Sequence, residues 1–112
     1  AFIAAAPVSG HRVVAWHGNE VLHADALTPE HLGRVVGVAL HAAAQGETVS
    51  VVASGEVVFN GWTFQSGQVW LGADGQLTQT PPAAGFDQVI GQALSATRLF
   101  VDIEEPVLRT YG

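Results

Sequence analysis

Short runs in which apolar and polar residues alternate recur along the chain, and no other feature constrains its fold more. Three of these runs are residues 12–16, 48–53 and 99–104. In the last of them, the acidic Asp102 and Glu104 alternate with apolar residues. Because successive side chains of a strand point to opposite faces, a period of two indicates strands with one buried and one exposed face. The runs therefore predict β-structure along the chain.

Turn residues separate these runs at the spacing that hairpins need. Gly18-Asn19 and Asp74-Gly75 each lie between short apolar runs, as two-residue hairpin turns do. Asn60-Gly61 is a third candidate turn, although a loop over residues 60–67 fits the same stretch. We therefore expect eight or nine short strands.

Helix signals are nearly absent. Thr28 can cap a helix whose first residue is Pro29, but Gly33 follows soon after. We expect at most one short helical turn, near residues 28–32. The predicted fold class is all-β, either a compact β-barrel or a β-sandwich.

The sequence repeats itself at an offset of 54 residues. Seven identical pairs align, among them the scarce Trp16 with Trp70. We interpret the pattern as two similar β units, about residues 11–58 and 66–107, that pack their apolar faces together. Neither unit could bury its apolar face alone.

Two glycines, Gly37 and Gly91, occupy matching places in the two units. When the second copy is shortened by four residues, the apolar positions of residues 49–53 also align with those of 99–103. A glycine inside a strand marks a bulge, a bend or a close backbone approach. We expect the two glycines to be the points where strands curl to close a barrel.

Residues 9–112 are expected to form one β domain, preceded by an apolar N-terminal arm of residues 1–8. The arm is too short to span a membrane and lacks the basic residues of a signal peptide. We expect it to be disordered alone and to order on assembly, so that its deletion leaves the melting temperature nearly unchanged.

Charged residues make up only 12% of the chain, with four basic residues against ten acidic ones and no cysteine. The absence of a basic cluster argues against nucleic acid as a partner, and the absence of cysteine excludes a disulfide framework. So few charges on a small β domain favour an oligomer, because a monomer would expose a large apolar surface.

No residue pattern predicts catalysis, a metal site or a cofactor. The five histidines are His11, His17, His23, His31 and His41. Of these, His17 and His23 could face each other across the first hairpin, but no carboxylate lies at a supporting spacing. Asp102, Glu104 and Glu105 fit the solvent face of an edge strand better than a calcium loop. We expect a protein that is not an enzyme.

Aromatic residues supply the candidate interface. Phe59, Trp62 and Phe64 lie in one predicted loop, and Phe2 and Ile3 lie in the arm. Aromatic anchors concentrate at the centres of interfaces, so these five residues are the predicted contacts with another subunit. Trp16 and Trp70, as repeat partners on apolar strands, are expected to pack in the core or at an interface rather than to form a sugar-binding platform.

Several segments resemble the small β domains of capsid-decoration (cement) and head-fibre proteins of tailed bacteriophages. They are the loop of residues 61–67 with the strand of 68–72, the Thr-rich return of 74–82, the strand of 89–97 and the acidic strand to Val107. The resemblance covers residues 66–107 well and residues 8–58 loosely.

This resemblance implies a non-catalytic virion component, often a homotrimer, that binds the major capsid protein and stabilises the shell. It would lie on the capsid exterior, and in the host cytoplasm during assembly, with no membrane and no nucleic-acid partner. The family has no catalytic motif, so no functional residue is carried over. Two alternatives stay open: a receptor- or glycan-binding domain of a tail fibre or other appendage, and an accessory β domain of a larger enzyme.

Overall fold

The structure is a computed structural model that describes residues 2–28, 31, 33–80, 85–104 and 107–108. Within these residues there are thirteen strands and a 3₁₀ turn, η2. The first seven strands are β1 (Phe2–Ile3), β2 (Val13–His17), β3 (Glu20–His23), β4 (Val35–Ala39), β5 (Thr48–Val49), β6 (Val51–Val52) and β7 (Ser54–Val58). They are followed by β8 (Gly67–Leu71), η2 (Ala73–Gly75), β9 (Leu77–Thr78), β10 (Phe86–Asp87), β11 (Val89–Ser95), β12 (Arg98–Asp102) and β13 (Val107–Leu108).

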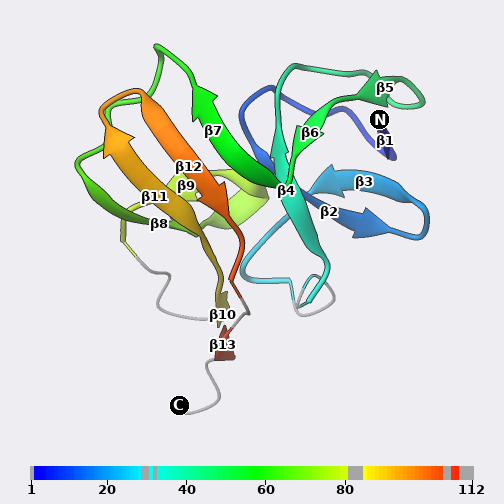
Figure 1. The fold of residues 1–112 in the computed structure, drawn as a ribbon. Coiled ribbons are helices and arrows are strands. Elements are labelled where there is room, and N and C mark those ends of the chain that lie inside the picture. Colours follow the sequence, from blue (N-terminus) through cyan, green and yellow to red (C-terminus); the bar gives the residue numbers. More distant parts are fainter. Residues whose placement is uncertain (1, 29–30, 32, 81–84, 105–106, 109–112) are drawn as a thin grey trace.

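Most strands belong to two antiparallel sheets that lie on either side of the molecule (Figure 1). The five-stranded sheet has the order β7-β12-β11-β8-β9, and the four-stranded sheet has the order β3-β2-β4-β6. β1 pairs with β5, and β10 pairs with β13. The predicted all-β class is confirmed, and the arrangement is sandwich-like rather than a closed barrel.

The main core lies between the two sheets and takes buried side chains from both. The four-stranded sheet supplies Val13, Ala15 and Val38, and the five-stranded sheet supplies Val57, Val69, Leu71, Ile90, Ala93, Leu99 and Val101. On β12 the burial alternates strictly, with Leu99 and Val101 inside and their neighbours exposed. The period of two in the sequence is therefore the period of burial.

Both predicted two-residue turns are present. Gly18-Asn19 joins β2 to β3, where His17 pairs with Glu20, and Gly18 has a φ of 65°. In the β8–β9 connection, Asp74 and Gly75 both have positive φ, 52° and 74°, as a type I′ turn requires. Strand β7 pairs with β12 and not with β8, so the stretch after β7 is the loop alternative and not a hairpin.

A second core covers the opposite face of the four-stranded sheet, and the N-terminal segment supplies two of its seven buried residues. Ala4 and Val8 are buried there with Val14, Val21 and three other residues. Strand β1 pairs with β5, and isolated bridges join Ala4 to Val21 and Val8 to Ala43. The expectation of a separate, disordered arm is thus wrong for residues 2–8, because their apolar side chains close a core that the sheet would otherwise expose.

The two sheets share a strand order that follows the predicted repeat. The order β3-β2-β4-β6 in the first corresponds to β9-β8-β11-β12 in the second, to which β7 is added. Gly37 pairs with Val14, and Gly91 pairs with Val69, so Val14 and Val69 are equivalent positions in the two sheets. The sequence alignment is therefore shifted by one residue on β2 and β8. Trp16 consequently occupies the position of Leu71 and not that of Trp70.

The last strands of the two units are also shifted relative to the sequence alignment. Ala39 of β4 pairs with Val51, and Ala93 of β11 pairs with Leu99. Val51 is therefore the structural partner of Leu99, although the sequence alignment had paired Leu99 with Val49. A shift of two residues keeps every side chain on its face, which is why the apolar pattern aligned equally well.

Gly37 and Gly91 are places where neighbouring backbones come close. A Cβ atom at Gly37 would lie 2.1 Å from the carbonyl oxygen of Val52, and one at Gly91 would lie 2.0 Å from that of Phe100. In both ladders the register shifts just before the glycine. The close approach that the sequence predicted is present, but it does not close a barrel, because the sheets stay separate.

The helical turn expected near residues 28–32 lies partly outside the described residues, which omit Pro29, Glu30 and Leu32. The backbone N–H of His31 donates to the carbonyl of Thr28 at 3.0 Å. This is the i to i+3 hydrogen bond of a 3₁₀ turn.

Candidate functional site

In the described part of the chain, no three histidine or acidic side chains lie close enough to hold a metal ion. His17 pairs with Glu20 across β2 and β3, whereas His23 pairs with Val14, so the two histidines do not face each other. Asp102 and Glu104 are exposed to solvent, and Glu105 lies outside the described residues.

Asp74 connects the two sheets from the tip of the β8–β9 hairpin. Its carboxylate accepts hydrogen bonds from Arg12 Nη1 at 3.2 Å and from His23 Nδ1 at 3.0 Å. The Nε2 of His23 accepts a hydrogen bond from the backbone N–H of Ser9 at 2.9 Å, so the proton of the neutral ring is on Nδ1. The carboxylate of Asp74, 3.2 Å from Arg12 Nη1, balances the positive charge of Arg12.

The loop of residues 59–66 between β7 and β8 is tied to its surroundings at several points. The backbone N–H groups of Phe59 and Phe64 donate to carbonyls in the turn between β11 and β12, at 2.9 and 3.0 Å. The side-chain amide of Gln79 bonds both the N–H and the carbonyl of Gln65, at 2.9 and 2.5 Å. These bonds fix the path of a loop that carries three aromatic side chains.

Those three aromatic residues, together with His11, form one cluster. The ring of Trp62 lies 5.6 Å from that of Phe59 in an edge-to-face contact and 5.1 Å from that of Phe64. His11 stacks on Phe59 with ring centroids 3.9 Å apart and an interplanar angle of 7°. We call these four residues the aromatic cluster. The structure thus brings Phe59, Trp62 and Phe64 together, as the sequence predicted for a single loop.

His11 is held in an uncommon backbone conformation. Its φ is 60°, in the left-handed region that few non-glycine residues adopt, although histidine does so more often than most. Its backbone N–H donates to the carbonyl of Ala39 at 2.7 Å. Burial lowers the pKa of the imidazole from its ordinary value of 6.5, so the ring on Phe59 is mainly neutral at pH 7.

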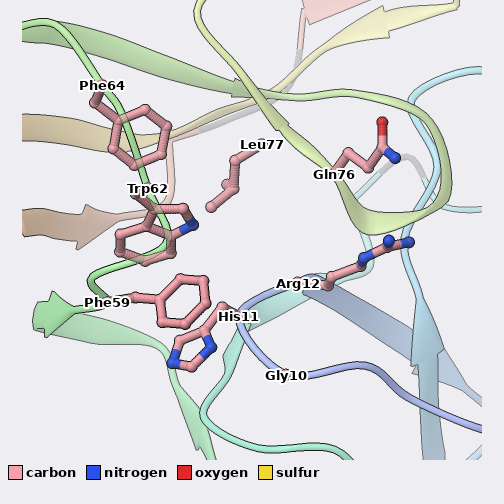
Figure 2. Close-up of a pocket in the computed structure, with 8 residues that line it drawn as sticks. All are labelled: Gly10, His11, Arg12, Phe59, Trp62, Phe64, Gln76 and Leu77. Carbon is pink, nitrogen blue, oxygen red and sulfur yellow. The ribbon is translucent and has the colours of Figure 1, made fainter. Parts of the chain in front are cut away.

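A pocket of about 280 Å³ opens beside the aromatic cluster (Figure 2). The aromatic cluster lines one side, and Arg12, Gln76 and Leu77 line the other, with Gly10 at the rim. We call it the aromatic pocket. It lies where three segments distant in sequence meet: residues 10–12, residues 59–64 and the end of the β8–β9 hairpin.

The outward surface of the five-stranded sheet, which we call the outer face, exposes large apolar side chains. Val58, Leu94 and Phe100 are 57%, 49% and 42% exposed. Between them, Arg98 Nε donates to the carboxylate of Glu56, and this hydrogen bond lowers the pKa of that carboxyl.

The remaining candidate residues lie away from the aromatic pocket. Phe2 is half-buried and packs edge-to-face on Trp16 at 5.2 Å, while Ile3 is 38% exposed. Trp16 is itself 39% exposed, and Trp70 is half-buried on β8. Neither tryptophan belongs to the main core, and the structure does not join Phe2 and Ile3 to the loop residues.

Sequence reasoning missed His11, Arg12, Gln76 and Leu77 as lining residues. Gly10-His11 is a turn that no strand pattern identifies, and its position beside the loop of residues 59–66 depends on the packing of the two sheets. The one available signal was that Gln76 and Leu77 immediately follow the predicted Asp74-Gly75 turn.

In comparisons with known proteins, no family model matches the chain, and no curated protein matches it. Among the described residues, the structure has no helix with the length and apolar character needed to cross a membrane.

Proposed function

We propose that the chain is a non-catalytic structural domain of a tailed-bacteriophage particle, of the capsid-decoration or head-fibre type, that binds neighbouring capsid subunits. The support from the sequence is the resemblance of residues 66–107 to that family, together with the low content of charged residues. On this proposal it acts on the capsid exterior, as a homotrimer that contacts the major capsid protein.

The observation that carries the proposal is the apolar outer face. Residues 67–102 supply four strands of the five-stranded sheet, whose inner side fills the core. On the other side, Leu94 and Phe100 remain exposed beside Val58. A sheet surface that exposes apolar side chains around one internally paired charge couple, Arg98 and Glu56, suits a broad contact with a protein more than a contact with a small molecule.

The first experiment is the mass of the purified protein in solution, followed by cosedimentation with capsids that lack their decoration protein. A trimer that cosediments with the capsids is the expected result. A monomer that does not bind them would contradict the decoration proposal.

A charged substitution then tests the outer face. Phe100→Asp is expected to weaken capsid binding by more than tenfold, because a carboxylate would be desolvated at the centre of the contact. The matched control is Gln45→Asp, which adds the same charge at an exposed turn away from the outer face. Equal binding by the two variants would show that the outer face is not the contact surface.

A further inference from the structure

We propose that the aromatic pocket binds a single neutral pyranose sugar ring. The proposal does not depend on the structural role above, since the outer face and the aromatic pocket use different residues. It rests on four properties of the pocket: its size, its aromatic wall, its unpaired hydrogen-bonding groups and its balanced charge.

The size and the wall suit a sugar ring. About 280 Å³ is just below the usual range of ligand pockets, roughly 300–1,000 Å³, so the space suits one ring rather than an extended ligand. A pyranose has C–H groups on one face and hydroxyl groups around its edge. Trp62 and Phe64 offer half-buried aromatic surface to such a C–H face, and Leu77 extends the apolar floor (Figure 2).

Two polar groups in the pocket have no partner within the described residues. The indole N–H of Trp62 points toward Leu77 and Gln76 in Figure 2, and it makes no hydrogen bond there. The side-chain amide of Gln76 is likewise free and exposed. Every buried side-chain donor and acceptor among the described residues has a hydrogen-bond partner. The two groups without a partner are therefore not buried, so both solvent and a ligand can reach them. They supply three N–H donors, one on the indole and two on the amide, and one acceptor oxygen for sugar hydroxyls.

The charges around the pocket favour a neutral ligand. Arg12 is the charged residue of the lining, and its guanidinium is already bonded to the carboxylate of Asp74. The burial-lowered pKa of His11 keeps its ring mainly neutral at pH 7. An anion would have to compete with Asp74 for Arg12, and the balanced Arg12–Asp74 pair leaves no net charge to attract a cation.

The pocket is also formed in advance. The aromatic loop is held by hydrogen bonds to the β11–β12 turn and to Gln79, and His11 is held by its bond to Ala39. A wall that needs no ordering on binding loses less conformational entropy, which matters for a ligand that makes few contacts.

The test is a titration of the ¹⁵N-labelled protein with methyl β-glucoside, methyl β-galactoside and N-acetylglucosamine, followed by NMR. We expect the indole N–H signal of Trp62 to shift with at least one of them, with a dissociation constant on the order of 1 mM, as is typical of a ligand of about a dozen heavy atoms. Dextran, added at equal sugar concentration, distinguishes a polysaccharide chain from a free sugar as the source of the ring.

Three variants make the result specific. Trp62→Phe keeps an aromatic ring but removes the N–H, and Gln76→Ala removes the amide. Each should weaken binding about fivefold, the value of one net hydrogen bond, as measured from the backbone amide signals around the pocket. Trp70→Phe, outside the pocket, should leave the affinity unchanged. The amide spectra of the free variants verify that each one is folded.

Several outcomes would overturn the proposal. One is no shift of the Trp62 signal at 50 mM sugar, roughly fifty times the expected dissociation constant. Others are stronger binding of choline, glucuronate or p-cresol than of any neutral sugar, or an equal loss of affinity in Trp70→Phe.

Discussion

Gly91 illustrates how one hydrogen atom in place of a side chain determines the geometry of a sheet. A methyl group there would lie 2.0 Å from the carbonyl oxygen of Phe100, so β11 and β12 would have to separate. We expect Gly91→Ala, and equally Gly37→Ala, to lower the free energy of unfolding by about 3 kcal/mol. Urea denaturation measures the change. Gln92→Ala, at the exposed neighbouring position, should change it by less than about 0.5 kcal/mol, and a similar small effect at Gly91 would contradict the close approach.

His11 makes stability depend on pH in a definite direction. Its pKa in the folded protein is lower than 6.5, so as the pH falls below 6.5 the unfolded chain takes up a proton before the folded one does. The stability contributed by the neutral ring is therefore complete above pH 6.5 and is lost as the pH falls toward the lowered pKa.

The variant His11→Asn isolates this effect, because asparagine tolerates the same backbone conformation and does not titrate. We expect the difference in unfolding free energy, wild type minus His11→Asn, to decrease between pH 7.5 and pH 5. Other groups titrate in both proteins, so their contributions cancel in the difference. A difference that stays constant with pH, or increases on acidification, would be the contrary result.

At the scale of the strand, the N-terminal segment packs against the four-stranded sheet and helps to form the second core. Val8 is 3% exposed and packs in the second core, so Val8→Ala should cost about 2 kcal/mol of stability. Deleting residues 1–8 should lower the melting temperature by about 10 °C or more, because Val14 and Val21 lose their cover. Val58→Ala, 57% exposed, is the control and should have almost no effect. An unchanged melting temperature after the deletion would restore the sequence-based expectation.

The same elements show which parts of the fold are local and which are not. The Gly18-Asn19 and Asp74-Gly75 turns and the alternation on β12 are properties of neighbouring residues, and the sequence predicted them. The burial of Ala4 and the stacking of His11 on Phe59 depend on contacts between distant segments, for which a short apolar run or a single histidine carries no pattern. The loop aromatics were predicted, but the opposite wall of their pocket was not.

The repeat, too, was predicted only in part from the sequence. Equivalent strand order in the two sheets supports a duplication, which we propose as the origin of the chain. The one-residue difference between the ladders of Gly37 and Gly91 shows why matching tryptophans misled the alignment. For deciding which residues are equivalent, an identical pair of scarce residues is weaker evidence than matching strand pairings. The reason is that a strand can shift by one residue relative to its neighbour during divergence.

For the whole molecule, the main core implies that neither half folds alone. Its buried residues come from both sheets, with Val13 and Val38 on one side and Leu71 and Leu99 on the other. Separating the halves would expose both apolar faces, and a fragment of about half this length buries a smaller fraction of its surface than the intact chain does. We expect urea unfolding of the intact chain to be a single transition, with an m value of about 1–2 kcal/mol/M.

Two fragments, residues 1–58 and 59–112, test this directly. Each should be unfolded by circular dichroism, and an equimolar mixture should regain β-structure, because the fragments together restore the main core. Coincident transitions by tryptophan fluorescence and circular dichroism would verify cooperativity in the intact chain. A fragment that folds alone, or two separate transitions, would mean that the repeat consists of two independent units in contact. In that case the first half would be stabilised mainly by the second core and not by the main core. The N-terminal strand, which packs in the second core, would then determine the stability of the first half.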